Sequence, residues 1–209
     1  VFDAGDLLMP GGDLVASLAV LREATEKISR AGAIAVVLGG DHSIASADVA
    51  GIANHLGHGK VSMIHFDAHA DTGEDQWGAL VGHGTPMRRL IDEGYVRGDK
   101  FLQLGLRGYW PDNATLMWMR DQGMRSYEMT EIHHRGLKEV LDESFATLTD
   151  GCDGVFLSVD IDVVDPGMAP GTGTPEPGGM TSRELLEAVR RICLELPVVG
   201  IDVVEVAPA

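Results

Sequence analysis

The stretch Val61-Ser62-Met63-Ile64-His65-Phe66-Asp67-Ala68-His69-Ala70-Asp71 changes character in its middle. Residues 61–66 are mostly apolar and few in number, a pattern that predicts a buried strand of a parallel sheet. After them, acidic residues and a histidine occupy every second position. Side chains of an extended segment alternate between faces, so we expect Asp67, His69 and Asp71 on one side. The stretch therefore predicts a buried strand that ends in a cluster of potential metal ligands.

Similar apolar runs recur along the chain and predict four more buried strands, at residues 34–38, 101–106, 155–159 and 198–204. Between the strands, apolar residues at three- and four-residue steps predict helices at residues 14–30, 44–56, 85–93, 135–148 and 182–196. Thr181 and Glu184 have the spacing of a capping box at the start of the last helix. This alternation predicts an α/β fold, a three-layer αβα arrangement around a parallel, doubly wound sheet.

Further ligand candidates stand where other predicted strands end. His42 follows the strand at 34–38, Asp160 and Asp162 follow the strand at 155–159, and Glu205 ends the strand at 198–204. In open α/β sheets this edge binds ligands, and neighbouring strands lie only about 4.8 Å apart. The groups can therefore converge on two ions roughly 3.5–4 Å from each other. Hard carboxylate oxygens mixed with imidazoles favour Mn²⁺, with Zn²⁺, Co²⁺ and Fe²⁺ as alternatives.

Length and composition narrow the class of protein. A chain of 209 residues is long enough for one well-buried domain. Its 32 acidic and 16 basic residues argue against a nucleic-acid partner and favour cationic small molecules or metal ions. The longest apolar runs fall far short of the roughly 20 residues that span a bilayer, so we expect no membrane segment. The two cysteines, Cys152 and Cys193, are predicted to be buried, inert thiols in a reducing cytoplasm.

Two further features of the sequence are its first residues and a Gly- and Pro-rich stretch. The first residues lack the pattern of a signal peptide, and because the chain does not begin with Met we expect an internal fragment of a longer protein. Residues 166–179 are rich in Gly and Pro but follow directly on the Asp160/Asp162 pair. Binding loops of α/β sheets lie at that place, so we predict an active-site loop rather than a linker.

Several of these motifs are similar to signatures of one enzyme family. Gly-Gly-Asp-His-Ser at 39–43, His-Phe-Asp-Ala-His-Ala-Asp at 65–71 and Ser-Val-Asp-Ile-Asp-Val-Val-Asp-Pro at 158–166 resemble the ureohydrolases, which include arginases and agmatinases. The resemblance continues through residues 82–86, 171–179 and 201–206. It implies the arginase/deacetylase-like fold and a hydrolase that cleaves a guanidino group with two Mn²⁺ ions.

The resemblance also implies a ligand set for each ion. The first Mn²⁺ would be held by His42, Asp67, Asp71 and Asp160, and the second by Asp67, His69, Asp160 and Asp162. Asp67 and Asp160 would then bridge the two ions. A water molecule shared by two cations loses its proton near neutral pH, and Asp71 would orient that water.

Three further residues receive catalytic or binding roles by resemblance. Glu205 would hold the guanidinium, because a carboxylate pairs with its planar N–H groups in a bidentate fork. Glu176, in the Gly- and Pro-rich loop, is a second acidic candidate. His83 would move the proton to the departing amine, since imidazole titrates near the working pH.

The segment after the Asp-Ala-His run bears on the substrate. Glu74 and Asp75 stand where arginase-like members bind an α-amino acid with polar residues, and Trp77 suits an alkyl chain or a cationic amine. This favours the agmatinase branch, with agmatine hydrolysed to putrescine and urea. Residues 105–111 instead resemble relatives that act on guanidino acids, such as guanidinobutyrase and proclavaminate amidinohydrolase. Arg107 there would either meet a substrate carboxylate or serve as a buried structural cation.

Other hypotheses remain open from the sequence. The chain could be an inactive, metal-binding subunit, although every expected ligand is present, or a deacetylase that uses one zinc ion. Family members usually have more residues before the strand at 34–38 and a final helix beyond Glu205. By resemblance the complete protein would be a homo-oligomer, a trimer or hexamer.

Overall fold

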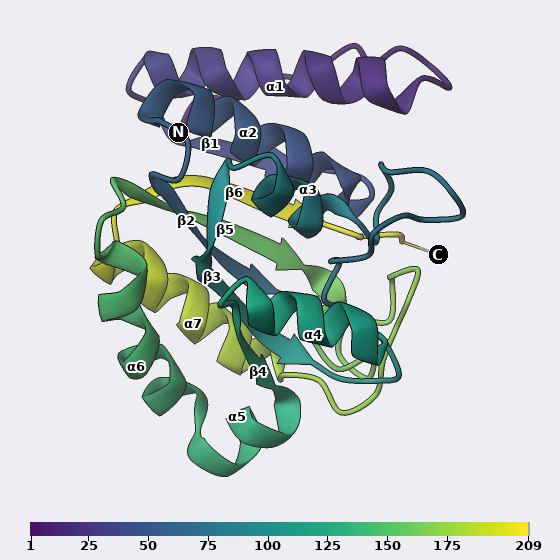
Figure 1. Ribbon diagram of the computed structural model, residues 1–209, viewed down its shortest axis with the longest axis vertical. Coiled ribbons are helices and arrows are strands. Elements are labelled where there is room, and N and C mark those ends of the chain that lie inside the picture. Colours follow the sequence, from purple (N-terminus) through teal and green to yellow (C-terminus); the bar gives the residue numbers. More distant parts are fainter. Residues whose placement is uncertain (209) are drawn as a thin grey trace.

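The computed structural model describes residues 1–208, which form a six-stranded parallel sheet with helices on both faces (Figure 1). The order across the sheet is β1-β6-β5-β2-β3-β4, and every neighbouring pair is parallel. The three-layer, doubly wound α/β prediction is thus confirmed. The strands are β1 (Ala35–Leu38), β2 (Val61–Phe66), β3 (Val96–Leu106), β4 (Arg125–Glu128), β5 (Gly154–Asp160) and β6 (Val198–Val204).

The helices divide between the two faces of the sheet (Figure 1). On one face, α2 (Ala45–Leu56) and α3 (Pro86–Asp92) bury Ile52 and Met87 with Phe156 of β5, while α1 (Leu14–Arg30) packs outside α2. α4 (Asn113–Asp121) meets the same cluster through Trp118. The opposite face is covered by α5 (Met129–Arg135), α6 (Leu137–Thr149) and α7 (Ser182–Glu195), whose apolar residues pack against Phe66.

The path of the chain brings four strand ends together. After β1 the chain crosses to β2 and continues outward through β3 and β4. It then returns on the other side of β2 and adds β5 and β6, so that β6 lies beside β1. The carboxyl ends of β1, β6, β5 and β2 are therefore adjacent, at the topological switch point where α/β sheets bind ligands.

The predicted elements agree well with the observed ones, with three omissions. The bounds of α1, β2 and β6 are as predicted, and the capping box of α7 is present, with Thr181 and Glu184 bonded to each other's backbone N–H. Strand β4 and helices α4 and α5 are missing from the prediction. β4 is an edge strand in which only Tyr127 is buried, so it contains no apolar run that the sequence pattern could reveal.

The expectation that both cysteines are buried is wrong. Cys193 is exposed on α7, one residue after Ile192, which points into the core. Cys152 is half-buried in the turn before β5.

Within residues 1–208, no helix is both long and apolar enough to cross a membrane.

Candidate metal centre

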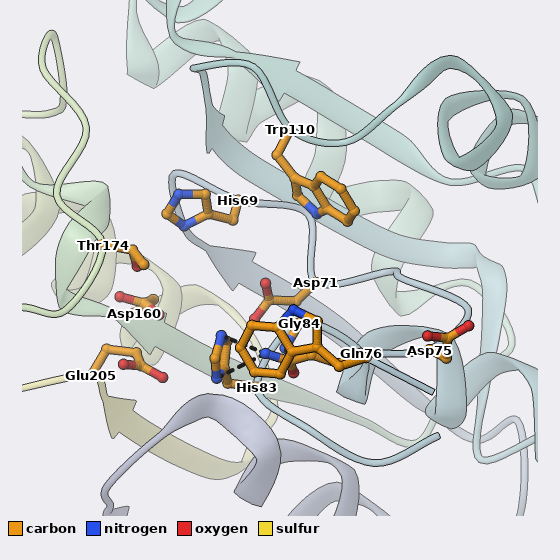
Figure 2. A pocket seen from close by; sticks show the side chains of 11 residues that line it. His69, Asp71, Asp75, Gln76, His83, Gly84, Trp110, Asp160, Thr174 and Glu205 are labelled. Atoms are coloured by element: carbon orange, nitrogen blue, oxygen red, sulfur yellow. Dashed lines mark hydrogen bonds between the residues drawn. The ribbon is translucent and has the colours of Figure 1, made fainter. Parts of the chain in front are cut away.

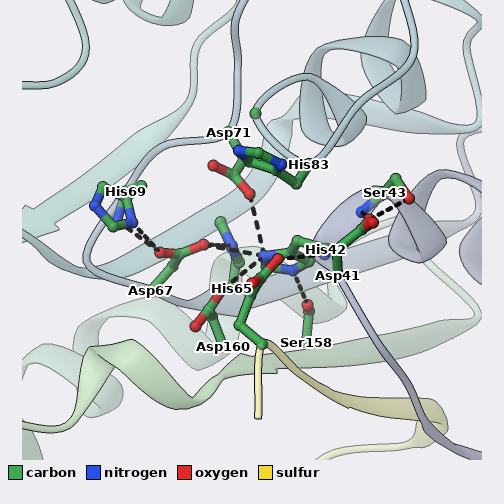
Figure 3. Close-up of polar contacts among 12 residues, drawn as sticks. Asp41, His42, Ser43, His65, Asp67, His69, Asp71, His83, Ser158 and Asp160 are labelled. Atoms are coloured by element: carbon green, nitrogen blue, oxygen red, sulfur yellow. Dashed lines mark hydrogen bonds and ion pairs between the residues drawn. The ribbon is translucent and has the colours of Figure 1, made fainter. Parts of the chain in front are cut away.

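His42 faces three carboxylates at the carboxyl edge of the sheet (Figure 3). It opens the short 3-10 helix η1 (His42–Ile44), which Asp41 caps by accepting a hydrogen bond from Ser43 N at 2.9 Å. Its Nδ1 atom lies 3.1 Å from Asp67 Oδ2, 3.1 Å from Asp71 Oδ2 and 3.2 Å from Asp160 Oδ2. All four side chains are buried.

This donor set fits a divalent cation. His42 Nδ1 is buried and has no hydrogen-bond partner in the described structure, although buried nitrogens are normally satisfied. One imidazole nitrogen and several carboxylate oxygens pointing at a common space are the ligands that hard or borderline cations such as Mn²⁺ take in proteins. A cation among these atoms would satisfy the nitrogen and neutralise the oxygens together.

A second cluster adjoins the first through Asp67. His69 Nδ1 lies 3.0 Å from Asp162 Oδ2 and 3.4 Å from Asp67 Oδ1. Asp67 therefore turns one oxygen toward His69 and the other toward His42, which is the arrangement of a carboxylate that bridges two ions. Asp162 is held in place because its Oδ1 accepts Ala68 N at 3.0 Å and its Oδ2 accepts Thr174 Oγ1 at 3.2 Å. The structure thus gathers all six predicted ligands.

The close approach of the carboxylates and histidines also changes the pKa values of the cluster. Burial and then the charge of Asp67 raise the pKa of Asp160 to about 9. Burial would lower the pKa of His69, but hydrogen bonds with Asp162 and Asp67 outweigh it and raise that pKa to about 11. A cation bound here would therefore compete with protons for Asp160 and His69.

The predicted ligands do lie together, but they do not share one face of an extended strand. Residues 67–71 lie beyond the end of β2, and Asp71 has a φ of 52°. Asp162 lies in the 3-10 helix η2 (Ile161–Val163), whose first turn closes when Asp160 Oδ1 accepts Asp162 N at 2.8 Å. Tight turns, rather than the alternation of a strand, bring the side chains together.

His65 positions Asp67, a role that the sequence left unassigned. Its Nε2 lies 2.8 Å from Asp67 Oδ2, and its Nδ1 lies 3.1 Å from Gln103 Nε2. Gln103 Nε2 also donates to the carbonyl oxygen of Ala70 at 2.7 Å, which fixes it as the amide nitrogen. His65 Nδ1 must then accept, so Nε2 carries the proton and donates to Asp67. We therefore place His65 behind a ligand rather than among the ligands.

Buried polar side chains also contact His42 on the side away from the carboxylates. His42 Nε2 lies 2.8 Å from Ser158 Oγ, and the next residue, Val159, donates its backbone N–H to Oδ1 of the buried Asp202 of β6 at 3.2 Å. Burial and then the charge of Asp202 raise the pKa of Asp48, on α2, well above its usual range. The contact with Ser158 occupies Nε2 of His42 and leaves Nδ1 on the side of the carboxylates, where it can bind a cation.

A cavity of about 360 Å³ opens above the cluster (Figure 2). Its floor is formed by the ligands His69, Asp71 and Asp160. The remaining lining residues are Asp75, Gln76, Trp77, His83, Gly84, Trp110, Thr174 and Glu205. Trp110, Gln76 and Thr174 were given no role from the sequence, although Trp110 and Thr174 lie within stretches that resemble the family.

Three of the predicted substrate-side residues line this cavity. Glu205, just after β6, has a φ of 59°, and its Oε1 accepts His42 N at 2.7 Å. The carboxylate is half-buried, and burial raises the pKa of Glu205. His83 is exposed to the cavity and touches Gln76. Trp77 lies at the mouth with 93% of its surface exposed.

Arg107 and Glu176 do not line the cavity. The Arg107 guanidinium donates to backbone carbonyl oxygens around it, those of Gly105, Asp162, Val163, Glu176 and Pro177. It ties the 166–179 loop to the strand ends, and these contacts favour the structural one of its two predicted roles. The Glu176 carboxyl lies against Gly108, outside the cavity.

Comparison with known proteins identifies the family to which the chain belongs. The whole chain, residues 1–209, matches the arginase family. The chain belongs to the arginase family. It is 40% identical to mitochondrial agmatinase of Gallus gallus, over all of this chain and 60% of that protein, and 36% identical to guanidinobutyrase of Pseudomonas aeruginosa, over all of this chain and 64% of that protein.

Solved structures agree with this assignment. Formimidoylglutamase of Bacillus subtilis superposes with a TM-score of 0.93 at 34% identity, over 99% of this chain and 64% of that structure. Proclavaminate amidinohydrolase of Streptomyces clavuligerus gives a TM-score of 0.87 at 37% identity, over 99% of this chain and 67% of that structure. The chain spans less than two thirds of the length of the curated relatives it matches.

Replacing a bridging carboxylate should empty both cation sites. We expect Asp67→Ala to bind Mn²⁺ at least roughly 100-fold more weakly at both sites, because loss of a direct ligand should exceed the loss seen when a residue that only hydrogen-bonds to a ligand is replaced. Elemental analysis after dialysis measures the effect, and Asp99→Ala, an exposed partner of Arg97, is the control. Two tightly held ions in Asp67→Ala would contradict the bridging geometry.

Cation binding should also release protons. Without a cation, His69 and Asp160 hold protons up to about pH 11 and pH 9, so both must lose them when the ion binds. We expect Mn²⁺ affinity to rise at least about tenfold per pH unit between roughly pH 6 and pH 8. Calorimetric titration in two buffers of different ionisation enthalpy counts the protons. Equal affinity across this range would show that the ligands are already deprotonated.

Proposed function

We propose that this protein is a binuclear manganese hydrolase that cleaves a guanidino group to urea and an amine, with agmatine as its substrate and putrescine as the second product. The choice of agmatine as substrate rests on the charge of the cavity. Its lining includes the carboxylates Asp71, Asp75, Asp160 and Glu205, and no lysine or arginine. Such a cavity favours a substrate that is cationic at both ends.

Glu205 is placed to hold the guanidinium over the metal cluster. One of its oxygens is fixed by His42 N, and its side chain reaches the cavity beside Asp160 (Figure 2). A fixed carboxylate can accept the parallel N–H groups of a guanidinium and so set its distance from the cluster. In a half-buried cavity this pair is stronger than at the surface.

The remaining residues supply orientation and proton transfer. Two cations bound by the six ligands would activate water for attack at neutral pH and stabilise developing negative charge. Asp71 faces both the cluster and the cavity, so it can orient the attacking group. His83, which also lines the cavity, can hold the proton that the departing amine needs.

The outer part of the cavity suits the primary amine of agmatine. Asp75, Trp77 and Trp110 lie there, and they offer one carboxylate and two aromatic rings. An ammonium group is attracted both to a carboxylate and to the face of an indole ring. A substrate carboxylate at the same place would be repelled by Asp75, which disfavours arginine and guanidino acids.

The second candidate is a guanidino-acid amidinohydrolase, and the relatives favour it. Guanidinobutyrase of Pseudomonas aeruginosa and proclavaminate amidinohydrolase of Streptomyces clavuligerus are 36% and 38% identical to this chain, close to the 40% of the agmatinase. For such a substrate, a cation would have to come from outside the residues described, since Arg107 is occupied by carbonyl oxygens. We also propose a cytoplasmic homo-oligomer, a trimer or hexamer, for the complete protein.

Urea release from three substrates tests the proposal. Full-length, Mn²⁺-loaded protein should hydrolyse agmatine with a clearly higher kcat/KM than 4-guanidinobutyrate or arginine, because Asp75 repels a carboxylate. Preference for 4-guanidinobutyrate would move the protein to the second candidate. No urea from any of the three would favour the inactive, metal-binding reading.

A pair of neighbouring variants isolates the amine site. We expect Asp75→Asn to lower kcat/KM for agmatine about twofold to fivefold, the range for an exposed ion pair. The variant keeps the oxygen that accepts Gly78 N, so the turn is preserved. Glu74→Gln, one residue earlier and outside the cavity lining, is the matched control. Equal effects of the two changes would argue against a specific amine contact.

A further inference from the structure

Both ends of the 166–179 loop meet at the carboxylate of Asp165. Its Oδ1 accepts Gly167 N at 2.9 Å, at the start of the loop. Its Oδ2 accepts Gly178 N at 2.9 Å and Gly179 N at 3.3 Å, at the end of the loop. The hydrogen bond from Gly167, followed by that from Gly178, lowers the pKa of Asp165 below its usual value. The carboxylate is therefore ionised at neutral pH, and both of its oxygens can accept.

Other contacts hold the loop at single places. The Arg107 guanidinium donates to the carbonyl oxygens of residues 176–177, and its other acceptors are carbonyl oxygens outside the loop. Ala207 N donates to the carbonyl oxygen of Gly171 at 2.9 Å. Neither contact joins the start of the loop to its end. Asp165 does, so its carboxylate closes the loop on itself.

The closed loop brings Thr174 to the metal cluster (Figure 2). Thr174 Oγ1 donates to Asp162 Oδ2 at 3.2 Å, and the same Oδ2 lies 3.0 Å from His69 Nδ1. The hydroxyl thus contacts the oxygen that faces the second cation site, which is the site beside His69 and Asp162. Because Asp162 Oδ1 is held separately by Ala68 N, the two contacts together fix the orientation of this carboxylate.

We propose that Asp165 is a positioning residue for the second cation site, because it closes the 166–179 loop and thereby holds Thr174 against Asp162. Residues that hydrogen-bond to a metal ligand orient it and strengthen the binding of the ion. The consequence for turnover rests on the proposed function, since the second cation matters for urea release only in such a hydrolase. Loop closure and cation affinity do not depend on turnover, so they can be measured separately.

Hydrogen exchange tests whether Asp165 closes the loop. Asp165→Asn keeps the size of the side chain, but it has one acceptor oxygen, and its N–H₂ group meets N–H donors at one end of the loop. At saturating Mn²⁺, we expect the peptide at residues 166–180 of the full-length protein to exchange at least about tenfold faster, as for lost hydrogen bonds to a charged acceptor. Asp153→Asn, an exposed carboxylate before the opposite end of β5, is the matched control. Equal exchange in Asp165→Asn and the wild type would overturn the proposal.

A second variant separates the two ends of the loop. The hydroxyl of Asp165→Ser can accept Gly167 N in a local turn, but it has no second oxygen for Gly178 and Gly179. We expect this variant to exchange as fast as Asp165→Asn, and it tests loop closure even if Asp165→Asn folds poorly. Exchange at the wild-type rate would show that the two ends need not be joined, which would also overturn the proposal.

Cation affinity tests the consequence for the second site. We expect Thr174→Val, which removes the hydroxyl at nearly constant shape, to weaken one of the two Mn²⁺ sites about tenfold to 100-fold. Asp165→Asn should weaken the same site about tenfold and leave the other within about threefold, because His42 and its carboxylates are unchanged. Equilibrium dialysis gives the affinities, and electron paramagnetic resonance distinguishes a single Mn²⁺ ion from a coupled pair. Asp153→Asn should match the wild type.

A double variant tests the path between Asp165 and the cation. In a Thr174→Val background, Asp165→Asn should cause no further loss of affinity, since its effect passes through the hydroxyl. Additive losses, or unchanged affinity in Asp165→Asn alone, would overturn the positioning role. If the wild type holds two ions and the variants behave as expected, but no urea is released from agmatine, 4-guanidinobutyrate or arginine, the proposed function fails and the role of Asp165 stands.

Discussion

The site depends on carboxylates that are buried without enough positive charge. Asp67, Asp71, Asp160 and Asp162 lie together at one edge of the sheet, and within residues 1–208 their ion-pair partners are all histidines. Burying a charge costs several kcal/mol per ion unless it is compensated, so this concentration is tolerable only with protons or with cations in place. Neighbouring residues hold the cluster: Arg107 fixes the loop behind Asp162, His65 contacts Asp67, and Ser158 contacts His42. The fold thus fixes these side chains through contacts of its own.

Backbone strain is concentrated at the same place. Within the described residues, the non-glycine positions with positive φ are Asp71, Trp77 and Glu205, and each of them lines the cavity. A conformation of this kind costs of order 1–3 kcal/mol, more for a bulky residue, and persists where surrounding contacts enforce it. Here the strain places the Asp71 carboxylate beside His42 Nδ1, the Glu205 carboxylate against His42 N and the Trp77 indole at the cavity mouth. Strain and function coincide because each side chain must leave the direction that a regular strand or turn would give it.

Sequence patterns predicted most strands and all six candidate ligands, but not the local structure that brings the ligands together. Apolar runs found the buried strands β2 and β6 because both faces of a parallel strand are covered, but they missed β4, where Tyr127 alone is buried. Motif resemblance marked the six ligands, yet the reason they meet was misjudged, since turns at Asp71 and Asp162 replace strand alternation. The sequence assigned no role to His65 or Asp48, because their contacts are made across the fold. For Arg107 it left a substrate-binding role and a structural role open, and the carbonyl oxygens around the guanidinium favour the structural one.

The central claim is that the two histidine nitrogens and four carboxylates hold a pair of cations that share Asp67. Anomalous diffraction at the manganese edge from crystals of the full-length, Mn²⁺-soaked protein tests it most directly. The account predicts two peaks about 3.5–4 Å apart, one beside His42 Nδ1 and the other beside His69 Nδ1, with Asp67 touching both. A single peak, or a second peak away from His69, would contradict the account.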